Sequence, residues 1–263
     1  MNRKKALIIT IASITLLVLI YAGPLRSQGK NSVSTTQDIE KEIPVVEFDR
    51  KTTGPNKLET ARASQELRIN RGRRFDDWQL VREPSSAEVT RIKIKNGWQA
   101  GLSALPVEKS DVVLIGSVSD AQAFLSNDKN GVYSEFSIQV TQLLKNISHS
   151  LLTAGGSVTV ERMGGRVRFS SNRVVTYMVS GQGMPRTGSR YAFFLAYDEQ
   201  RQTYPLLTAY ELANGLVVPV DGKRVSGGSW KFDVYDGVDE SLFLKELGAA
   251  LSQPSVRGEV KVS

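Results

Sequence analysis

Short apolar runs separated by turn residues fill the stretch between residues 111 and 220, and this pattern constrains the fold most. Several runs alternate apolar with polar residues, as half-buried strands do, and none shows the period of an amphipathic helix. The expected strands are DVVLIGSVSDAQAF, YSEFSIQVTQLL, SVTVERM, GRVRFS, RVVTYMVS, RYAFFLAY, YPLLTAY and GLVVPV. About eight strands in some 120 residues predict a small barrel or sandwich. We expect a mainly β fold with a closed barrel of short antiparallel strands over residues 104–222.

The last part of the chain, residues 223–263, predicts one extra strand, a helix and a tail. The segment SWKFDVYDG is the possible strand, and DESLFLKELGAALSQP has the spacing of a helix. Asp239 is suited to cap the N-terminus of this helix, and Pro254 lies just past its end. The apolar stripe consists of Leu242, Phe243, Leu247 and Leu251. We expect this stripe to pack on the barrel.

The first 23 residues predict a membrane anchor. Arg3, Lys4 and Lys5 precede an apolar run from Ala6 to Ala22. With Gly23, the run spans about 27 Å as a helix, close to the roughly 30 Å of a hydrocarbon core. The basic flank stays in the cytoplasm, so the remainder lies outside, in the periplasm or the extracellular space. The expected localisation is therefore the cell membrane, crossed once.

A signal peptide that is cleaved, leaving a secreted protein, is the alternative for the same segment. Cleavage requires small residues in an A-x-A pattern. Ile20 is bulky where a small residue is needed, and Pro24 directly follows Gly23. These two features favour the uncleaved anchor.

Residues 24–103 predict a stalk or linker between the anchor and the barrel. Its first half is polar and rich in Ser, Thr, Gly and Pro, which is typical of a flexible segment. A short helix is possible near residues 57–71, where the apolar stripe is thin. A basic cluster follows, which could contact anionic lipid or a polyanion, or could simply be solvated. Its members are Arg68, Arg71, Arg73 and Arg74.

The distribution of charge argues against a nucleic-acid partner. The first 103 residues hold 18 Lys and Arg against 11 Asp and Glu, which accounts for the whole net charge of +7. The expected barrel is neutral, so we expect no nucleic acid. The chain has no cysteine, which excludes disulfides, thiol catalysis and thiolate metal sites, and His149 is its single histidine. We therefore expect neither a cofactor nor a metal.

The stretch SNDKNGVYSEFSIQV resembles a calcium loop at first sight, because Asp128, Asn130 and Gly131 have suitable offsets. Such a loop needs an acid at its first position and a bidentate Glu at its twelfth. Here these positions are Ser126 and Ser137. Asn, Asp and Gly also tolerate the positive φ of tight turns, so residues 127–131 are predicted to be the turn of a β hairpin.

The sequence selects no catalytic residue. The segment GMPRTGSR has the two glycines of a phosphate loop but lacks the following Lys and helix, and no G-x-S-x-G elbow occurs. A pair of carboxylates could perform acid–base chemistry, yet the spacing of the Asp and Glu residues picks out no pair. The sequence therefore leaves open whether the protein is an enzyme, and the absence of a catalytic motif favours one that is not.

One strand face is a candidate for binding a ligand. In GRVRFS, Arg166 and Arg168 alternate with apolar residues, and NRVVTYMVS adds Arg173 and Tyr177. If these strands are neighbours, the four residues form a basic patch with an aromatic edge, which could bind an anion or an acidic partner. The alternative is an ordinary solvated strand face.

Part of the chain resembles a known type of barrel. The carrying features are the strand that begins at Asp111, its successor that ends in LLKN, and the Gly-x-Arg-Tyr entry to YAFFLAY. Residues 110–198 resemble secreted or membrane-anchored bacterial proteins with an OB-like barrel of the netrin-like and metalloproteinase-inhibitor-like kind. The resemblance implies a five-stranded barrel. The disulfides and the inhibitory N-terminal Cys of the animal members are absent, so no inhibitor mechanism follows.

These observations favour a membrane-tethered, extracytoplasmic β-barrel module that binds or scaffolds another molecule. Its partners would be the membrane, through the N-terminal helix, and a protein, glycan or small ligand outside the cell. The alternative is an extracytoplasmic hydrolase with a carboxylate or serine site that the sequence does not identify. A purely structural envelope component is a third possibility.

Overall fold

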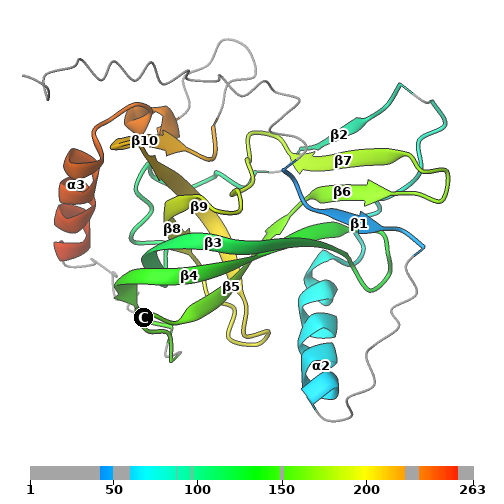
Figure 1. Ribbon diagram of the computed structural model, residues 1–263, viewed down its shortest axis with the longest axis horizontal. Coiled ribbons are helices and arrows are strands. Elements are labelled where there is room, and N and C mark those ends of the chain that lie inside the picture. The colour runs from blue at the N-terminus through cyan, green and yellow to red at the C-terminus, as the bar shows by residue number, and fades with distance from the viewer. Residues whose placement is uncertain are drawn as a thin grey trace, which may run out of the picture. The chain divides into compact units, whose positions relative to one another are not determined.

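The computed structural model describes residues 42–49, 60–86, 88–95, 97–148, 151–222 and 231–253. The expected anchor, residues 1–23, lies outside these residues. Within the described ranges, no helix combines the length and the apolar character that crossing a bilayer requires. The described residues form a mainly β structure with two sheets, two α-helices and two short 3₁₀-helices (Figure 1).

A closed barrel of five strands is the centre of this structure, as the sequence predicts. The strands are β3 (Val112–Leu125), β4 (Val132–Asn146), β5 (Ser157–Met163), β8 (Arg190–Leu195) and β9 (Tyr204–Ala213). Their order around the barrel is β3-β4-β5-β9-β8, and β8 pairs with β3 to close it. Four of the five pairings are antiparallel, whereas β5 and β9 run parallel. The strand β10 (Leu216–Pro219) extends the sheet beyond β9.

Alternation along the strands explains why the barrel closes around an apolar core. Phe136, Ile138 and Val140 of β4 point inward and are buried among apolar residues of the other strands. Gly116 lies where β3 shifts register, and a Cβ there would approach the Gln139 carbonyl oxygen to 2.6 Å. The glycine in this run therefore allows the sharp bend that a small barrel needs.

Two of the strands expected in the barrel belong instead to a second sheet. The strands β6 (Gly165–Arg168) and β7 (Val174–Val179) form a hairpin, flanked by β1 (Val45–Glu47) and β2 (Arg91–Ile94). Both flanking strands pair in parallel. Gly164, with φ +106°, lies directly after β5 and lets the chain leave the barrel at that point. The expectation that all of these strands form one antiparallel barrel is therefore wrong for β6 and β7.

Residues of the expected stalk also pack against the strands. The helix α2 (Thr60–Gly72) coincides with the predicted short helix and continues into the 3₁₀-helix η1 (Arg73–Phe75). Phe75 is buried and stacks on Tyr133 of β4, with 4.5 Å between ring centroids. The backbone N–H groups of Leu80 and Val81 donate to the carbonyl oxygen of Asn130 in the β3–β4 turn. This segment is thereby fixed to the outside of the barrel.

The C-terminal helix is confirmed as α3 (Glu240–Ser252), with Asp239 as its N-cap. Its buried residues are Phe243 and Leu247, which pack in a cluster with residues of β8, β9 and β10. Leu242 is 48% exposed, because the buried face runs through Phe243 and Leu247 instead. The extra strand expected in this part is absent from the described residues. The segment forms the 3₁₀-helix η2 (Lys231–Tyr235) instead, and its Phe232 is buried in the same cluster.

Candidate functional site

The predicted arginine patch divides between the two faces of its hairpin. β6 and β7 are neighbours, and Arg166 lies opposite Thr176 while Gly165 lies opposite Tyr177. Arg166 and Arg168 therefore share one face, and Tyr177 belongs to the other. Tyr177 is buried, and its hydroxyl donates a hydrogen bond to the Arg82 carbonyl oxygen at 2.8 Å. Tyr177 thus anchors the segment before β2 and does not join the arginines.

The arginines of the patch have partners in the chain itself. Arg168 lies 3.6 Å from Glu47 on the neighbouring strand β1. Arg173 donates to the carbonyl oxygens of Pro84 and Ser86. An open pocket of about 330 Å³ adjoins Arg168, and Glu47 and Asp49 also line it. The patch therefore combines acidic and basic groups.

The hairpin turn at residues 127–131 is confirmed between β3 and β4. Asp128 accepts hydrogen bonds from the Ser126 hydroxyl and from the backbone N–H groups of Asn130 and Asp77. Desolvation acts to raise the pKa of the exposed Asp128, but these hydrogen bonds outweigh it, and the pKa lies well below its usual range. Among the described residues, no group of three or more His, Cys, Asp or Glu could hold a metal ion. His149 lies outside them.

A pair of glutamates on the outer face of the barrel is the main feature that the sequence did not reveal. Glu135 of β4 lies directly opposite Glu161 of β5. Their side chains are only 13% and 2% exposed. Arg71 of α2 approaches Glu135 at 3.0 Å, and Arg74 of η1 approaches Glu161 at 2.8 Å. We call Glu135 and Glu161 the carboxylate pair.

Burial governs the protonation of the carboxylate pair. It raises the pKa of Glu135 despite the charges of Arg71 and Arg68, and it raises the pKa of Glu161 despite Arg74. The Tyr133 hydroxyl is buried and has no hydrogen-bond partner among the described residues. Burial raises the pKa of Tyr133 most, and the charges of the two glutamates raise it further. Burial therefore disfavours the charged forms of all three acidic groups on this face.

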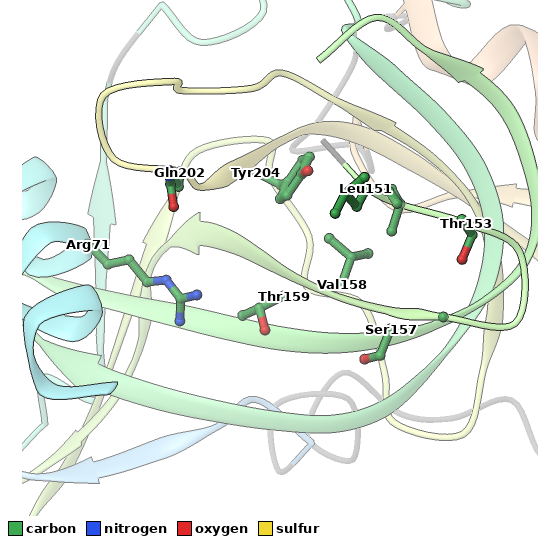
Figure 2. A pocket seen from close by; sticks show the side chains of 10 residues that line it. Arg71, Leu151, Thr153, Ser157, Val158, Thr159, Gln202 and Tyr204 are labelled. Carbon is green, nitrogen blue, oxygen red and sulfur yellow. The ribbon is translucent and has the colours of Figure 1, made fainter. Parts of the chain in front are cut away.

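An open pocket of about 280 Å³ lies beside the carboxylate pair, and we call it the α2–β5 pocket. Figure 2 shows Arg71 reaching from α2 toward Thr159 of β5, with Gln202 and Tyr204 across from it. The lining residues are Arg71, Leu151, Leu152, Thr153, Gly156, Ser157, Val158, Thr159, Gln202 and Tyr204. Arg71 thus belongs both to this pocket and to the ion pair with Glu135.

The pocket combines apolar and polar walls. Leu151 is fully exposed at its rim, and the Tyr204 ring lies 5.1 Å from that of Tyr197. Hydroxyl groups of Ser157 and Thr159 and the amide of Gln202 offer hydrogen bonds. Thr159 and Glu161 are two positions apart on β5, so they share a face and the pocket adjoins the carboxylate pair.

Sequence signals for this site exist but are incomplete. Glu135 alternates with Phe136, which indicates that it points away from the core. Its partner depends on the register between β4 and β5, and Arg71 arrives from a segment expected to be stalk. Each residue was visible in the sequence, whereas the contacts between them were not.

The comparisons with known proteins add no relative. No protein-family model matches the chain, and no curated protein matches it significantly. What the protein does must therefore be inferred from its own residues.

Proposed function

We propose that the protein is a membrane-tethered, extracytoplasmic binding module whose barrel takes a small ligand or a glycan in the α2–β5 pocket. The observation that carries this proposal is the composition of the pocket walls. A tyrosine ring, two leucines, a valine, three Ser and Thr hydroxyl groups, an amide and a guanidinium line one open cavity. Ligand sites typically combine apolar walls with a few polar groups that orient the ligand, in cavities from about 300 Å³ upward.

The topology of the barrel supports an OB-like assignment, which we include in the proposal. Five strands close the barrel, and the third and fifth in chain order, β5 and β9, are the parallel pair. OB-folds are five-stranded Greek-key barrels that bind oligonucleotides or oligosaccharides on the face of their second and third strands. Here those strands are β4 and β5, and β5 contributes Ser157, Val158 and Thr159 to the α2–β5 pocket.

Binding in the pocket is tested with the full-length protein and a library of monosaccharides, oligosaccharides, amino acids and short peptides. We expect at least one compound class to raise the melting temperature. Tyr204→Ala should weaken its binding about tenfold or more, because the ring forms one wall of the pocket. Val234→Ala is the control, since Val234 is exposed on η2 and does not line the pocket. A hit that Tyr204→Ala leaves unchanged would contradict the proposed pocket.

The membrane tether is tested by its topology. A reporter enzyme that is active only outside the cytoplasm is fused after Ser263, and we expect it to be active. The basis is the basic flank and apolar run of residues 1–23. Activity of a reporter that works only in the cytoplasm would refute this part of the proposal.

A hydrolase that uses two carboxylates is the second candidate, and the carboxylate pair is the observation that favours it. Neighbouring carboxyl groups with raised pKa values can supply a proton donor and a base. Both groups are ion-paired with arginines and do not line the pocket, which is why we rank binding first. Glu161→Gln should abolish hydrolysis of any library compound if the protein is an enzyme, and should leave binding intact if it is not.

A further inference from the structure

We infer that the α2–β5 pocket selects ligands that carry an oxyanion, and that Arg71 moves from Glu135 to this oxyanion while Glu135 takes up a proton. This inference rests on the proposed binding function and adds the chemical class of the ligand. The ligand is a small molecule with a carboxylate, sulfate or phosphate group and a polar or partly apolar body.

The charge of the pocket wall points to an anion. Among the described lining residues, Arg71 alone carries a formal charge. Its guanidinium has five N–H donors, and a single contact of 3.0 Å joins its Nη1 to Oε2 of Glu135. The remaining donors suit the paired oxygen atoms of a carboxylate or phosphate, which arginine binds in a two-bonded geometry. Ser157, Thr159 and Gln202 add neutral donors nearby.

The surroundings of Glu135 determine what happens when Arg71 turns to a ligand. Glu135 is largely buried, and its Oε1 accepts no hydrogen bond from the described residues. Leaving a buried charge without its partner is costly, and such a group neutralises itself instead by binding a proton. The carboxylate Glu135–COO⁻ then becomes Glu135–COOH with a proton from solvent. The ligand keeps its own negative charge.

The surroundings of Glu135 act on this proton uptake in opposite directions: burial and the neighbouring Glu161 favour it, whereas the charge of Arg68 opposes it. Arg68 and Arg71 face it from α2, while Tyr133 of β4 and Glu161 of β5 lie beside it. Arg74 is occupied by Glu161. Burial already raises the pKa of Glu135 while Arg71 is in place, so the loss of Arg71 raises it further. Binding and proton uptake are therefore linked, and affinity falls as pH rises, by up to about tenfold per pH unit for one proton.

The test uses the full-length protein with glucuronate, glucose and inorganic phosphate as probes. Titration calorimetry in two buffers of different ionisation enthalpy measures the protons taken up on binding. We expect glucuronate to bind about tenfold or more tightly than glucose, with proton uptake and weaker binding from roughly pH 5.5 to 7.5. Phosphate binding at about pH 5.5, where the ion is mainly a monoanion like glucuronate, would show that the oxyanion suffices. No phosphate binding would show that the organic body is also required.

Three variants isolate the exchange of Arg71. Arg71→Gln should lose glucuronate binding by at least about tenfold, whereas Arg73→Gln, an exposed arginine outside the pocket, should not. Glu135→Gln should bind glucuronate at least as tightly as the natural protein near neutral pH, with no proton uptake and no pH dependence. The same pH dependence in Glu135→Gln as in the natural protein would overturn the role of Glu135.

Failure of this inference can be told apart from failure of the binding function. If glucose and glucuronate bind equally and Tyr204→Ala weakens both, the pocket binds ligands but does not select an oxyanion. If glucuronate and phosphate do not bind at millimolar concentration while another library compound does, the inference is again overturned and the binding function stands. If no compound binds, both fall together.

Discussion

Arg162 and Asp221 form a two-bonded ion pair in the interior of the protein. Nη1 of Arg162 lies 2.6 Å from Oδ1 of Asp221, and Nη2 lies 2.8 Å from Oδ2. The two side chains are 1% and 0% exposed. Arg162 also donates a hydrogen bond to the Gly183 carbonyl oxygen, and the Gly183 N–H donates one to Asp221. One buried pair thereby joins β5, the segment before β8 and the end of β10.

Removing one charge of this pair should be severely destabilising. Asp221→Asn leaves the Arg162 guanidinium buried without a counter-charge, and we expect a loss of about 3–5 kcal/mol in the free energy of unfolding. Urea unfolding measures it. The matched control is Asp198→Asn, which breaks the partly exposed pair with Arg201 and should cost about 1 kcal/mol or less. Equal losses in the two variants would contradict the structural role of the buried pair.

The close approach of η1 to the β3–β4 turn should not tolerate a side chain at Gly131. An added Cβ at this position would collide with the carbonyl oxygen of Phe75. Gly131→Ala should therefore lower the free energy of unfolding by roughly 1–3 kcal/mol and weaken the near-ultraviolet signal of the Phe75–Tyr133 stack. Gly97→Ala has open space around the new methyl group and should change stability by less than about 0.5 kcal/mol. A tolerated Gly131→Ala would mean that the two segments separate easily.

One glycine in α3 offers a gain in stability. Gly248 lies inside the helix, and an added Cβ would meet nothing within 4 Å. Gly248→Ala should raise the free energy of unfolding by about 0.5–1 kcal/mol, because alanine restricts the unfolded chain and favours the helix. Thermal unfolding measures the shift in melting temperature. A decrease would indicate that this face of α3 contacts another surface.

The dependence of stability on pH should distinguish Glu161, whose pKa is raised in the folded protein, from Asp128, whose pKa is lowered. Burial raises the pKa of Glu161 in the folded protein. Ionisation of Glu161 therefore lowers the free energy of unfolding, and this loss is complete above the pKa of the folded state. As pH falls from 7 toward the ordinary glutamate value, the natural protein should gain stability relative to Glu161→Gln. Urea unfolding at several pH values measures this difference, with the exposed Glu199→Gln as control.

The effect of pH on stability has the opposite sign for Asp128. Desolvation acts to raise its pKa, but its hydrogen bonds outweigh this effect and lower the pKa. Its contribution is present above its ordinary pKa and is lost as pH falls further. Asp128→Asn should therefore cost stability near neutral pH and progressively less in acid. A cost that does not change with pH would show that the turn depends on shape and not on the charge of Asp128.

Local patterns in the sequence were sufficient for the strands from β3 to β10 and for α3. The alternation around Phe136 and Ile138 indicates which side of β4 faces the core, and Asp239 indicates where α3 begins. The second sheet could not be predicted, because β1 and β2 join it from distant positions and Gly164 turns the chain out of the barrel. Long-range pairing leaves no periodic signal in any single segment.

In the candidate site, too, the sequence predicts the features that depend on one segment but not those that depend on pairing between segments. Tyr177 is in phase with its buried neighbours Val175 and Val179, so its burial is encoded locally. The opposition of Glu135 and Glu161 is set by strand register. A shift of one residue would place one of them on the core face.

The seam between β5 and β9 in the barrel has two paired positions, Val160 with Tyr204 and Glu161 with Pro205. Pro205 has no N–H to donate across this seam. Fewer backbone hydrogen bonds therefore hold the seam than hold the long β3–β4 ladder. We expect this seam to open more readily than the longer ladders, so that its amides exchange with deuterium first. Thr159 and Tyr204 line the pocket from the two sides of the seam. We expect a ligand bound in the proposed pocket to bridge the two strands and to slow this exchange.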